Sequence, residues 1–138
     1  MTDAVVQNNL KQSGLRPTRQ RLMIGSKLWM DRWAAETRHI TAEQLHKECA
    51  ADGMQVSMAT VYNTLHQFVE VGLLREVVID SGRSYFDTNV DHHHHFLNED
   101  TGELTDIPRD DVSIAHLPEP ANGHEVTSVD VVIRVKSA

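Results

Sequence analysis

Four consecutive histidines are the most distinctive chemical feature of this sequence, in the segment DHHHHF at residues 91–96. Side chains alternate between two faces along an extended strand. We therefore expect His93 and His95 to point one way, and His92 and His94 to point the other. Neutral imidazole binds zinc, iron, copper or nickel, and it is also an axial ligand of haem iron. The run predicts a site for a metal ion or haem.

Two further side chains can complete a shell of nitrogen and oxygen donors. Asp87 ends the second strand of a predicted hairpin, and His39 precedes a predicted helix. Together with His93 and His95 they predict a metal site between the two halves of the chain, where an ion would set their relative angle. The alternative is a generic histidine-rich loop. An expression tag is disfavoured because the run is internal and flanked by Asp and Phe.

A second group of residues has the chemistry of base recognition. Ser57 can cap a helix that runs through ATVYNTLHQFVEV and ends at Gly72. Its apolar positions 61, 65, 68 and 69 form one stripe, so Tyr62 and Asn63 fall largely on other faces. An amide side chain can bind adenine, and an aromatic ring can pack on a thymine methyl group. The alternative is a helical protein in which Tyr62 merely closes the core.

The elements around this helix predict a winged helix-turn-helix domain. Helices are expected over 5–13, 18–33, 41–52 and 57–71, and Thr41 with Gln44 has the pattern of a capping box. A short link containing Gly53 joins the last two helices. The runs 73–80 and 83–87 then predict a β-hairpin that turns at Ser81–Gly82. Helices followed by a hairpin are typical of the winged form.

The second half of the chain predicts a small α/β unit. Strands are expected at 93–97, 103–106 and 126–135, and the last is so apolar that both of its faces are expected to be buried. Pro118 and Pro120 prevent a long helix between 108 and 124. This unit is too small to bury the last strand alone, so we expect a homodimer interface to cover it. The fold class is thus α+β, with domains at 1–88 and 89–138.

Composition excludes several other classes of protein. The chain has 138 residues, of which 40% are hydrophobic and 24% are charged, so it is neither wholly disordered nor collagen-like. It contains no apolar stretch long enough to span a bilayer, and no secretory signal pattern. Its single cysteine, Cys49, forms no internal disulfide and no cysteine-rich zinc site. We expect a cytoplasmic protein.

The net charge of −7 is unevenly distributed. Residues 1–90 hold 10 basic and 10 acidic side chains, and residues 91–138 hold 3 and 10. Residues 10–38 contain seven basic and two acidic side chains. This local excess of positive charge can lie along a phosphate backbone. A solvated helix face is the alternative. The residues expected to contact DNA are Arg16, Arg19, Arg21, Ser57, Thr60, Tyr62 and Asn63.

The segments GLRPTRQR, HITAEQLH, SMATVYNTLHQFVEVGLL and HHHH, in this order, resemble the ferric uptake regulator (Fur) family over nearly the whole chain. Within it, TVYNTLHQF, SYFDTN and VDVVIRV are similar to the iron response regulator (Irr) branch of alphaproteobacteria. The resemblance implies a dimeric winged-helix regulator. It places the regulatory metal at His39, Asp87, His93 and His95. It gives Tyr62 a base contact and Arg16 a minor-groove contact.

The sequence also departs from the family pattern at two metal sites. His92 and His94 match part of a second site whose other ligands are missing. The CxxC motif of a structural zinc site is replaced by Asn98 and Thr101, so no such zinc is expected. The Irr branch implies haem as the signal, received by His92, His93, His94 and His95, and control of haem-synthesis and iron genes.

We therefore expect a transcription regulator rather than an enzyme, with haem or a divalent metal (Fe, Mn or Zn) as cofactor and double-stranded DNA as partner. A metal-activated Fur-type repressor is the nearest alternative. A histidine-site metalloenzyme or metal-storage module is more remote, because no general base accompanies the histidines.

Overall fold

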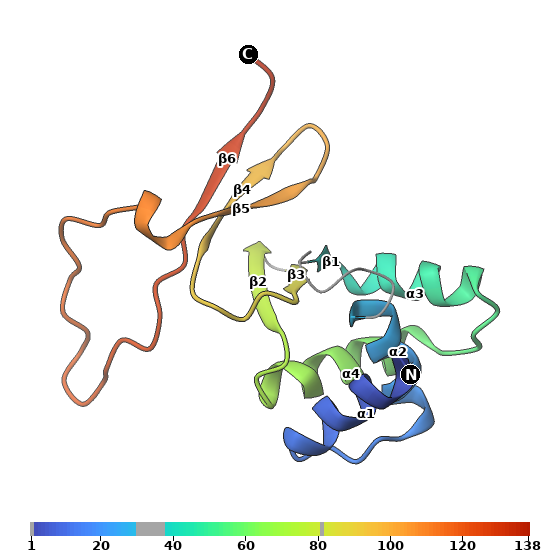
Figure 1. Cartoon of the computed structure of the whole chain (residues 1–138). Coiled ribbons are helices and arrows are strands. Elements are labelled where there is room, and N and C mark those ends of the chain that lie inside the picture. Colours follow the sequence, from blue (N-terminus) through green and yellow to red (C-terminus); the bar gives the residue numbers. More distant parts are fainter. Residues whose placement is uncertain (1, 30–37, 81) are drawn as a thin grey trace. The chain divides into compact units, whose positions relative to one another are not determined.

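The computed structural model describes residues 2–29, 38–80 and 82–138. The chain divides into two compact units, Met1–Val90 and Asp91–Ala138, each with its own sheet (Figure 1). The described α-helices belong to the first unit, and strands dominate the second. This confirms the α+β class, with a winged-helix domain followed by a smaller unit. No helix in the described ranges is both long and apolar enough to cross a membrane.

The first unit contains helices packed on a small antiparallel sheet. Its described helices are α1 (Thr2–Gln12), α2 (Arg19–Trp29), α3 (Ala42–Ala51) and α4 (Met58–Glu70). Its strands are β1 (His39–Ile40), β2 (Arg75–Asp80) and β3 (Arg83–Asp87), in the order β1-β3-β2. The predicted helices are thus present. The end of the predicted helix 18–33 and Ser81 of the predicted turn lie outside the described residues.

The helix-turn-helix pair begins and ends where its capping residues predict. The Thr41 side chain accepts a hydrogen bond from the Gln44 N–H, and the Gln44 side chain accepts one from the Thr41 N–H, which confirms the capping box. Ser57 caps α4 by accepting from the Thr60 N–H at 3.0 Å. The helices end near Gly53 and Gly72, whose φ values of 77° and 82° other residues rarely adopt.

The predicted apolar stripe of α4 lies in the core. Val61, Leu65 and Phe68 are fully buried, and the aromatic ring of Trp29 lies 5.2 Å from that of Phe68. Burial of each such side chain stabilises the fold by roughly 1.5–3 kcal/mol. The core cluster also includes Val6, Leu10, Ile24, Leu28, Ile40, Ala42, Leu45, Cys49, Leu74 and Phe86. This packing fixes which face of α4 remains at the surface.

The wing is a hairpin of β2 and β3, and β1 lies on the other side of β3. The predicted first strand started at residue 73, but β2 starts at Arg75, because Leu73 and Leu74 pack at the end of α4 instead. β3 spans the predicted residues 83–87. β1 pairs with β3 and sets His39 opposite Asp87.

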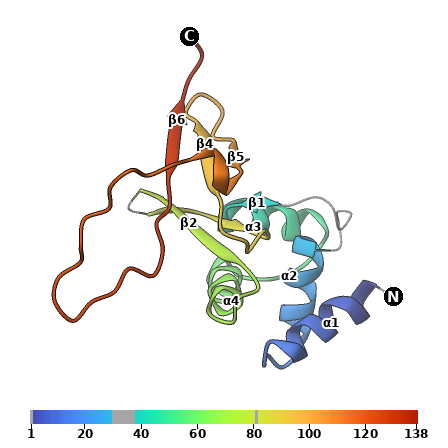
Figure 2. The same cartoon turned by 60° about the vertical axis from the view of Figure 1, so that its left-hand side comes forward.

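The second unit is a three-stranded sheet in the order β5-β4-β6. β4 (His94–Asn98) pairs antiparallel with β5 (Leu104–Ile107) and parallel with β6 (Val132–Val135). A short 3-10 helix, η1 (Arg109–Asp111), follows β5. Between Val112 and Val131 the chain forms a long loop with neither helix nor strand (Figure 2).

The predicted strand at 126–135 is wrong in its extent. β6 begins only at Val132, and Ile133 and Val135 are more than a third exposed. The physical reason is that β4 begins only at His94: the Val131 carbonyl still accepts from the His95 N–H at 3.1 Å, and the residues before it have no strand to pair with. Histidine side chains bond to that stretch instead: His92 Nε2 lies 3.0 Å from the Val129 carbonyl oxygen, and His94 Nδ1 accepts from the Val131 N–H.

Candidate metal centre and nucleic-acid interface

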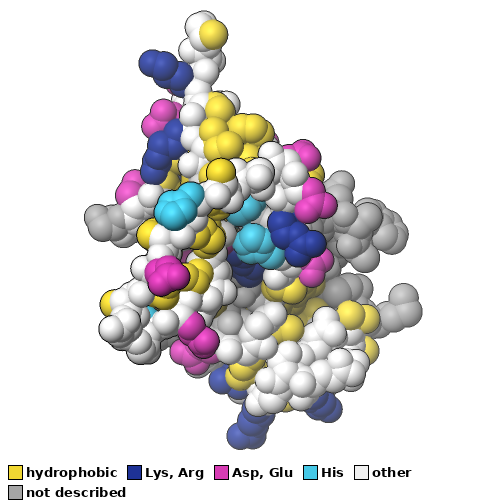
Figure 3. Space-filling model, turned by 90° about the vertical axis from the view of Figure 1, so that its left-hand side faces the viewer, with side chains coloured by type: hydrophobic (Ala, Val, Ile, Leu, Met, Phe, Trp, Pro, Cys, Tyr) yellow, Lys and Arg dark blue, Asp and Glu magenta, His cyan; other side chains and the backbone are white. Residues whose placement is uncertain are grey.

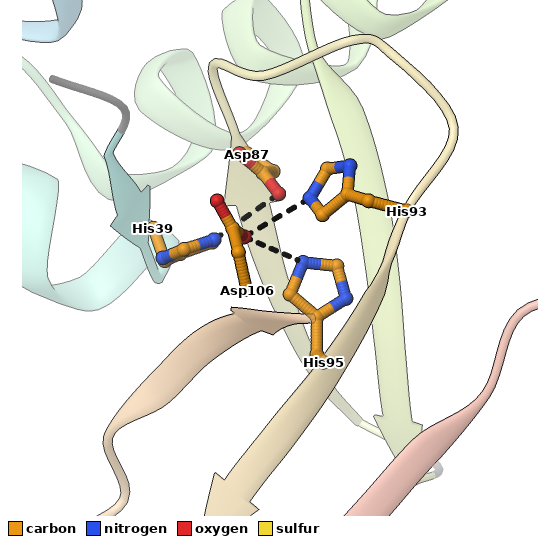
Figure 4. A group of neighbouring side chains, drawn as sticks. All are labelled: His39, Asp87, His93, His95 and Asp106. Atoms are coloured by element: carbon orange, nitrogen blue, oxygen red, sulfur yellow. Dashed lines mark ion pairs between the residues drawn. The ribbon is translucent and has the colours of Figure 1, made fainter. Parts of the chain in front are cut away.

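In the first unit, the strand pairing brings together one histidine and one carboxylate. His39 Nε2 lies 3.1 Å from Asp87 Oδ2, and the other Asp87 oxygen accepts a hydrogen bond from the Asn89 N–H at 2.8 Å (Figure 4). Asp87 is fully buried. A buried carboxylate is costly unless a cation or several donors compensate it. We call His39 and Asp87 the N-terminal donor pair.

In the second unit, the histidine run alternates as predicted. The rings of His93 and His95 lie 4.5 Å apart on one side, and those of His92 and His94 lie 5.0 Å apart on the other. His93, His94 and His95 are buried, whereas His92 is exposed. The two pairs therefore have different surroundings and different chemistry.

Asp106 is a candidate ligand that the sequence analysis missed. β5 pairs with β4 so that Asp106 lies opposite His95. Its Oδ1 atom lies 3.0 Å from His93 Nε2 and 3.4 Å from His95 Nε2 (Figure 4). Both strands were predicted, and the register of the hairpin between them was the signal that would have found this residue. We call His93, His95 and Asp106 the C-terminal donor set.

The C-terminal donor set has the chemistry of a cation site. His93 Nδ1 lies within hydrogen-bond distance of the Asp91 carbonyl oxygen, which can only accept, so this nitrogen carries the proton. In neutral His93, Nε2 then presents a lone pair to the carboxylate of Asp106. A proton on Nε2 or a bound metal ion stabilises so close an approach of this nitrogen to a carboxylate oxygen, so the set suits a cation. The backbone carbonyl fixes the tautomer in the way that is usual for metal-ligating histidines.

His92 and His94, predicted for haem or a second metal, are tied to the backbone before β6. His94 Nδ1 accepts from the Val131 N–H, so the neutral ring keeps its proton on Nε2. Burial lowers the pKa of His94, and the neighbouring His92 lowers it further. In this tautomer, neither nitrogen of His94 offers a lone pair to an ion. His92 donates through Nε2 to Val129 and retains a lone pair on Nδ1.

The predicted base-reading residues of α4 occupy two different environments. Tyr62 is 49% exposed, and Asn63 is exposed beside it. The Ser57 hydroxyl, in contrast, is engaged with the Thr60 N–H and with the Thr60 hydroxyl. Ser57 and Thr60 therefore build the start of α4, while Tyr62 and Asn63 project from its surface.

The three predicted arginines also differ. Arg16 and Arg19 are exposed, as expected of residues that contact a phosphate backbone. Arg21 is half-buried and donates from Nε to the Gln67 side chain at 3.2 Å and from its guanidinium to the Arg16 carbonyl oxygen at 2.9 Å. Arg21 thus ties α4 to the segment that carries Arg16. Thr18, Gln20, Arg21, Thr60, Asn63, Thr64 and Gln67 line a polar hollow here.

The turn between β4 and β5 contains Asn98 and Thr101, the positions at which no structural zinc site was expected. Asn98 Oδ1 accepts from the N–H groups of Asp100 and Thr101 at 2.9 and 3.2 Å. The Gly102 N–H donates to the Asn98 carbonyl oxygen at 2.7 Å. Hydrogen bonds of the Asn98 side chain thus organise this turn.

A winged-helix unit joined to a unit rich in histidine and carboxylate donors has the organisation of a metal-responsive transcription regulator. The comparisons with known proteins agree. The profile of the ferric uptake regulator family matches residues 12–134. The chain belongs to the ferric uptake regulator family, whose members are transcription regulators and not enzymes.

Individual relatives support this assignment. The chain is 36% identical over 104 residues to the ferric uptake regulation protein of Haemophilus ducreyi, covering 75% of this chain and 68% of that protein. The ferric uptake regulator of Pseudomonas aeruginosa, solved with manganese, superposes with a TM-score of 0.67 at 28% identity, over 96% of this chain and 98% of that one. The regulator of Vibrio cholerae superposes with a TM-score of 0.70 at 25% identity, over 95% and 98%. Against curated relatives the chain spans between 64% and 68% of their length.

Proposed function

We propose that this protein is an iron-responsive transcription regulator that binds double-stranded DNA as a homodimer and whose DNA affinity depends on a ligand bound by its histidines. The observation that carries the proposal is the meeting of His93 and His95 with Asp106, a nitrogen and oxygen set that suits a divalent ion of iron, manganese or zinc. The manganese-bound relative from Pseudomonas aeruginosa supports it.

A single divalent ion bound by both donor groups is the simplest mechanism. The N-terminal donor pair offers two protein ligands and the C-terminal donor set offers three, so neither provides four. Only residues 88–92 separate Asp87 from His93 along the chain. An ion that takes ligands from both would restrict the freedom of the winged-helix unit relative to the sheet. Any effect of the ion on DNA affinity is matched by an equal effect of DNA on ion affinity.

Base recognition is assigned to the exposed face of α4. Tyr62 and Asn63 are the side chains that contact base edges, and Arg16 and Arg19 contact the phosphate backbone or minor groove. Ser57, Thr60 and Arg21 support them by shaping α4 and the segment before α2.

The second unit provides the dimer contact. Phe96 and Ile133 are paired neighbours on β4 and β6, and both are more than a third exposed, as is Val135. Hydrophobic side chains gather on this unit, in the yellow patch near the top of Figure 3. A second copy of the chain would remove this apolar face from water.

A more specific proposal is that the ligand is haem. It is supported by the likeness of the sequence to the Irr branch. The imidazoles of His92, His93, His94 and His95 are suitable axial ligands for haem iron. Bound haem would supply a signal of haem status. Because His94 Nδ1 accepts from the Val131 N–H, ligation by that atom would require this hydrogen bond to change, whereas His92 could bind through Nδ1 and keep its bond to Val129.

One experiment tests the function. A duplex is selected from random sequence by the purified, full-length protein, and binding is followed by fluorescence anisotropy with chelator, with Mn²⁺ and with haem. We expect sequence-specific binding, and a change of about 5- to 150-fold with the active ligand. Absence of any sequence preference under all three conditions would refute the proposal.

Absorbance spectroscopy then separates haem from metal. A Soret band that shifts on mixing and is lost in the triple variant His93→Ala/His94→Ala/His95→Ala supports haem. If the native protein takes up no haem but responds to Mn²⁺, the metal-activated mechanism holds and the haem proposal is removed.

A further inference from the structure

His66 lies between the base-reading side chain Tyr62 and the core of the wing. Its ring centroid is 4.4 Å from that of Tyr62, at an interplanar angle of 53°. On its other side, it is 5.5 Å from the ring of Phe86, edge to face at 90°. Tyr62 and His66 are one turn apart on α4, so the three rings form a continuous column from the helix surface to β3.

The polar edge of His66 faces the same wing. His66 Nε2 is buried, makes no hydrogen bond with any described residue, and lies 4.0 Å from Glu76 Oε2. Glu76 is the residue of β2 that pairs directly with Phe86 of β3. His66 therefore contacts both strands of the wing at a single register position.

This placement gives the Tyr62 ring a packing partner that is itself held by the wing. The tyrosine ring is half-exposed, so without a packed neighbour it would sample several rotamers. The His66 ring packs against one face of the Tyr62 ring and limits these rotamers. The His66 ring is in turn held in place by its contact with Phe86 of the wing. Order in a recognition side chain before binding lowers the entropic cost of the base contact.

We propose that His66 is a positioning residue for DNA sequence recognition, which holds Tyr62 in its base-reading orientation by stacking between it and Phe86. The inference rests on the proposed function, in which Tyr62 reads bases. His66 itself makes no base contact in this proposal. Its ring, rather than its charge, carries the role.

The test compares two apolar replacements of similar bulk. His66→Phe keeps an aromatic ring in the column, whereas His66→Leu fills the space without one. Both remove the nitrogen atoms, so any difference between them reports the ring. His116→Ala, in an exposed position of the loop after β5, serves as the histidine control.

Each protein is titrated against the duplex selected by the wild type and against a random duplex of equal length, and the ratio of the two affinities is measured. We expect His66→Leu to lower this ratio about 3- to 10-fold, a typical value for an aromatic pair, and His66→Phe to retain it. A structural role alone would lower binding to both duplexes alike and leave the ratio unchanged.

The outcomes separate this inference from the function on which it rests. If the wild type does not distinguish the two duplexes, the proposed function fails. If the wild type distinguishes them and the ratio is the same for His66→Leu, the positioning role is overturned and the proposed function stands. If His66→Leu does not fold, a fall of the ratio in His66→Phe to the level measured for Tyr62→Ala also overturns it.

Discussion

His39 and Asp87 lie opposite each other on β1 and β3, with His39 Nε2 3.1 Å from Asp87 Oδ2. The flanking backbone holds this register: the Thr88 N–H donates to the Arg38 carbonyl oxygen, and the Arg38 N–H donates to the Thr88 hydroxyl. A buried carboxylate next to the His39 imidazole is thus built into the edge of the wing. Its position favours a role for the wing in ligand binding.

Replacement of either carboxylate should weaken binding of a divalent ion. We expect Asp87→Asn and Asp106→Asn each to lower Mn²⁺ affinity at least about 10-fold, because loss of even an indirect partner of a metal ligand commonly costs 10- to 100-fold. Isothermal titration calorimetry measures this. Asp110→Asn, at a carboxylate that is 95% exposed, is the matched control and should bind normally. Normal binding by Asp106→Asn would remove that residue from the site.

The Ser57 side chain should act on stability rather than on phosphate binding. It caps α4 through the Thr60 N–H, so Ser57→Ala is expected to lower the free energy of unfolding by about 1 kcal/mol. Urea denaturation measures this change. If Ser57 instead contacted a phosphate, the variant would keep its stability and lose affinity for selected and random duplexes alike, with the wild-type salt slope, because a neutral hydroxyl displaces no counterion.

Local signals in the sequence predicted the first unit better than the second. Capping residues and the stripe of α4 are short-range features, and they gave the ends of α3 and α4 closely. Asp106 was missed because its approach to His93 and His95 depends on strand register across a turn. The extent of β6 was overestimated because apolar character alone cannot show how much partner strand is available. The alternation of the four histidines needed only the geometry of an extended chain.

Gly25 shows how a residue that is unfavourable locally can be required by packing. Glycine lowers helix propensity, yet α2 continues through it. A Cβ atom here would lie 2.7 Å from Val6 Cγ1 and 2.9 Å from Trp29 Cζ3. We expect Gly25→Ala to destabilise the protein by roughly 1–3 kcal/mol. Thermal unfolding tests this, with Gln20→Ala on the exposed face of α2 as control. An increase in stability would show that α1 can move aside at little cost.

Cys49 should be unreactive in the folded protein. It is fully buried in α3. Burial raises the pKa of its thiol; the Lys27 ammonium opposes this shift, while Glu48 and Asp52 add to it. Because the thiolate is the nucleophile, alkylation by iodoacetamide at pH 8 should be slow in buffer and fast in urea. The raised pKa also means that its contribution to stability is complete below the unfolded pKa and is lost as the pH rises towards the folded value. Rapid labelling in buffer would show that α3 opens readily.

Arg16 and Arg21 should affect DNA binding in different ways, although both are arginines at the same end of α2. Arg16 is exposed, and if it contacts a phosphate, Arg16→Ala reduces the slope of log affinity against log salt concentration by about 1. The Arg21 guanidinium is engaged with Gln67 and with the Arg16 carbonyl oxygen, so it positions these groups without releasing counterions. Arg21→Ala should therefore lower affinity while keeping the wild-type slope. Anisotropy titrations between about 50 and 200 mM salt distinguish the two variants, because such slopes are resolved over this range. A reduced slope in Arg21→Ala would mean that its hydrogen bonds to Gln67 and Arg16 give way to a phosphate when DNA binds.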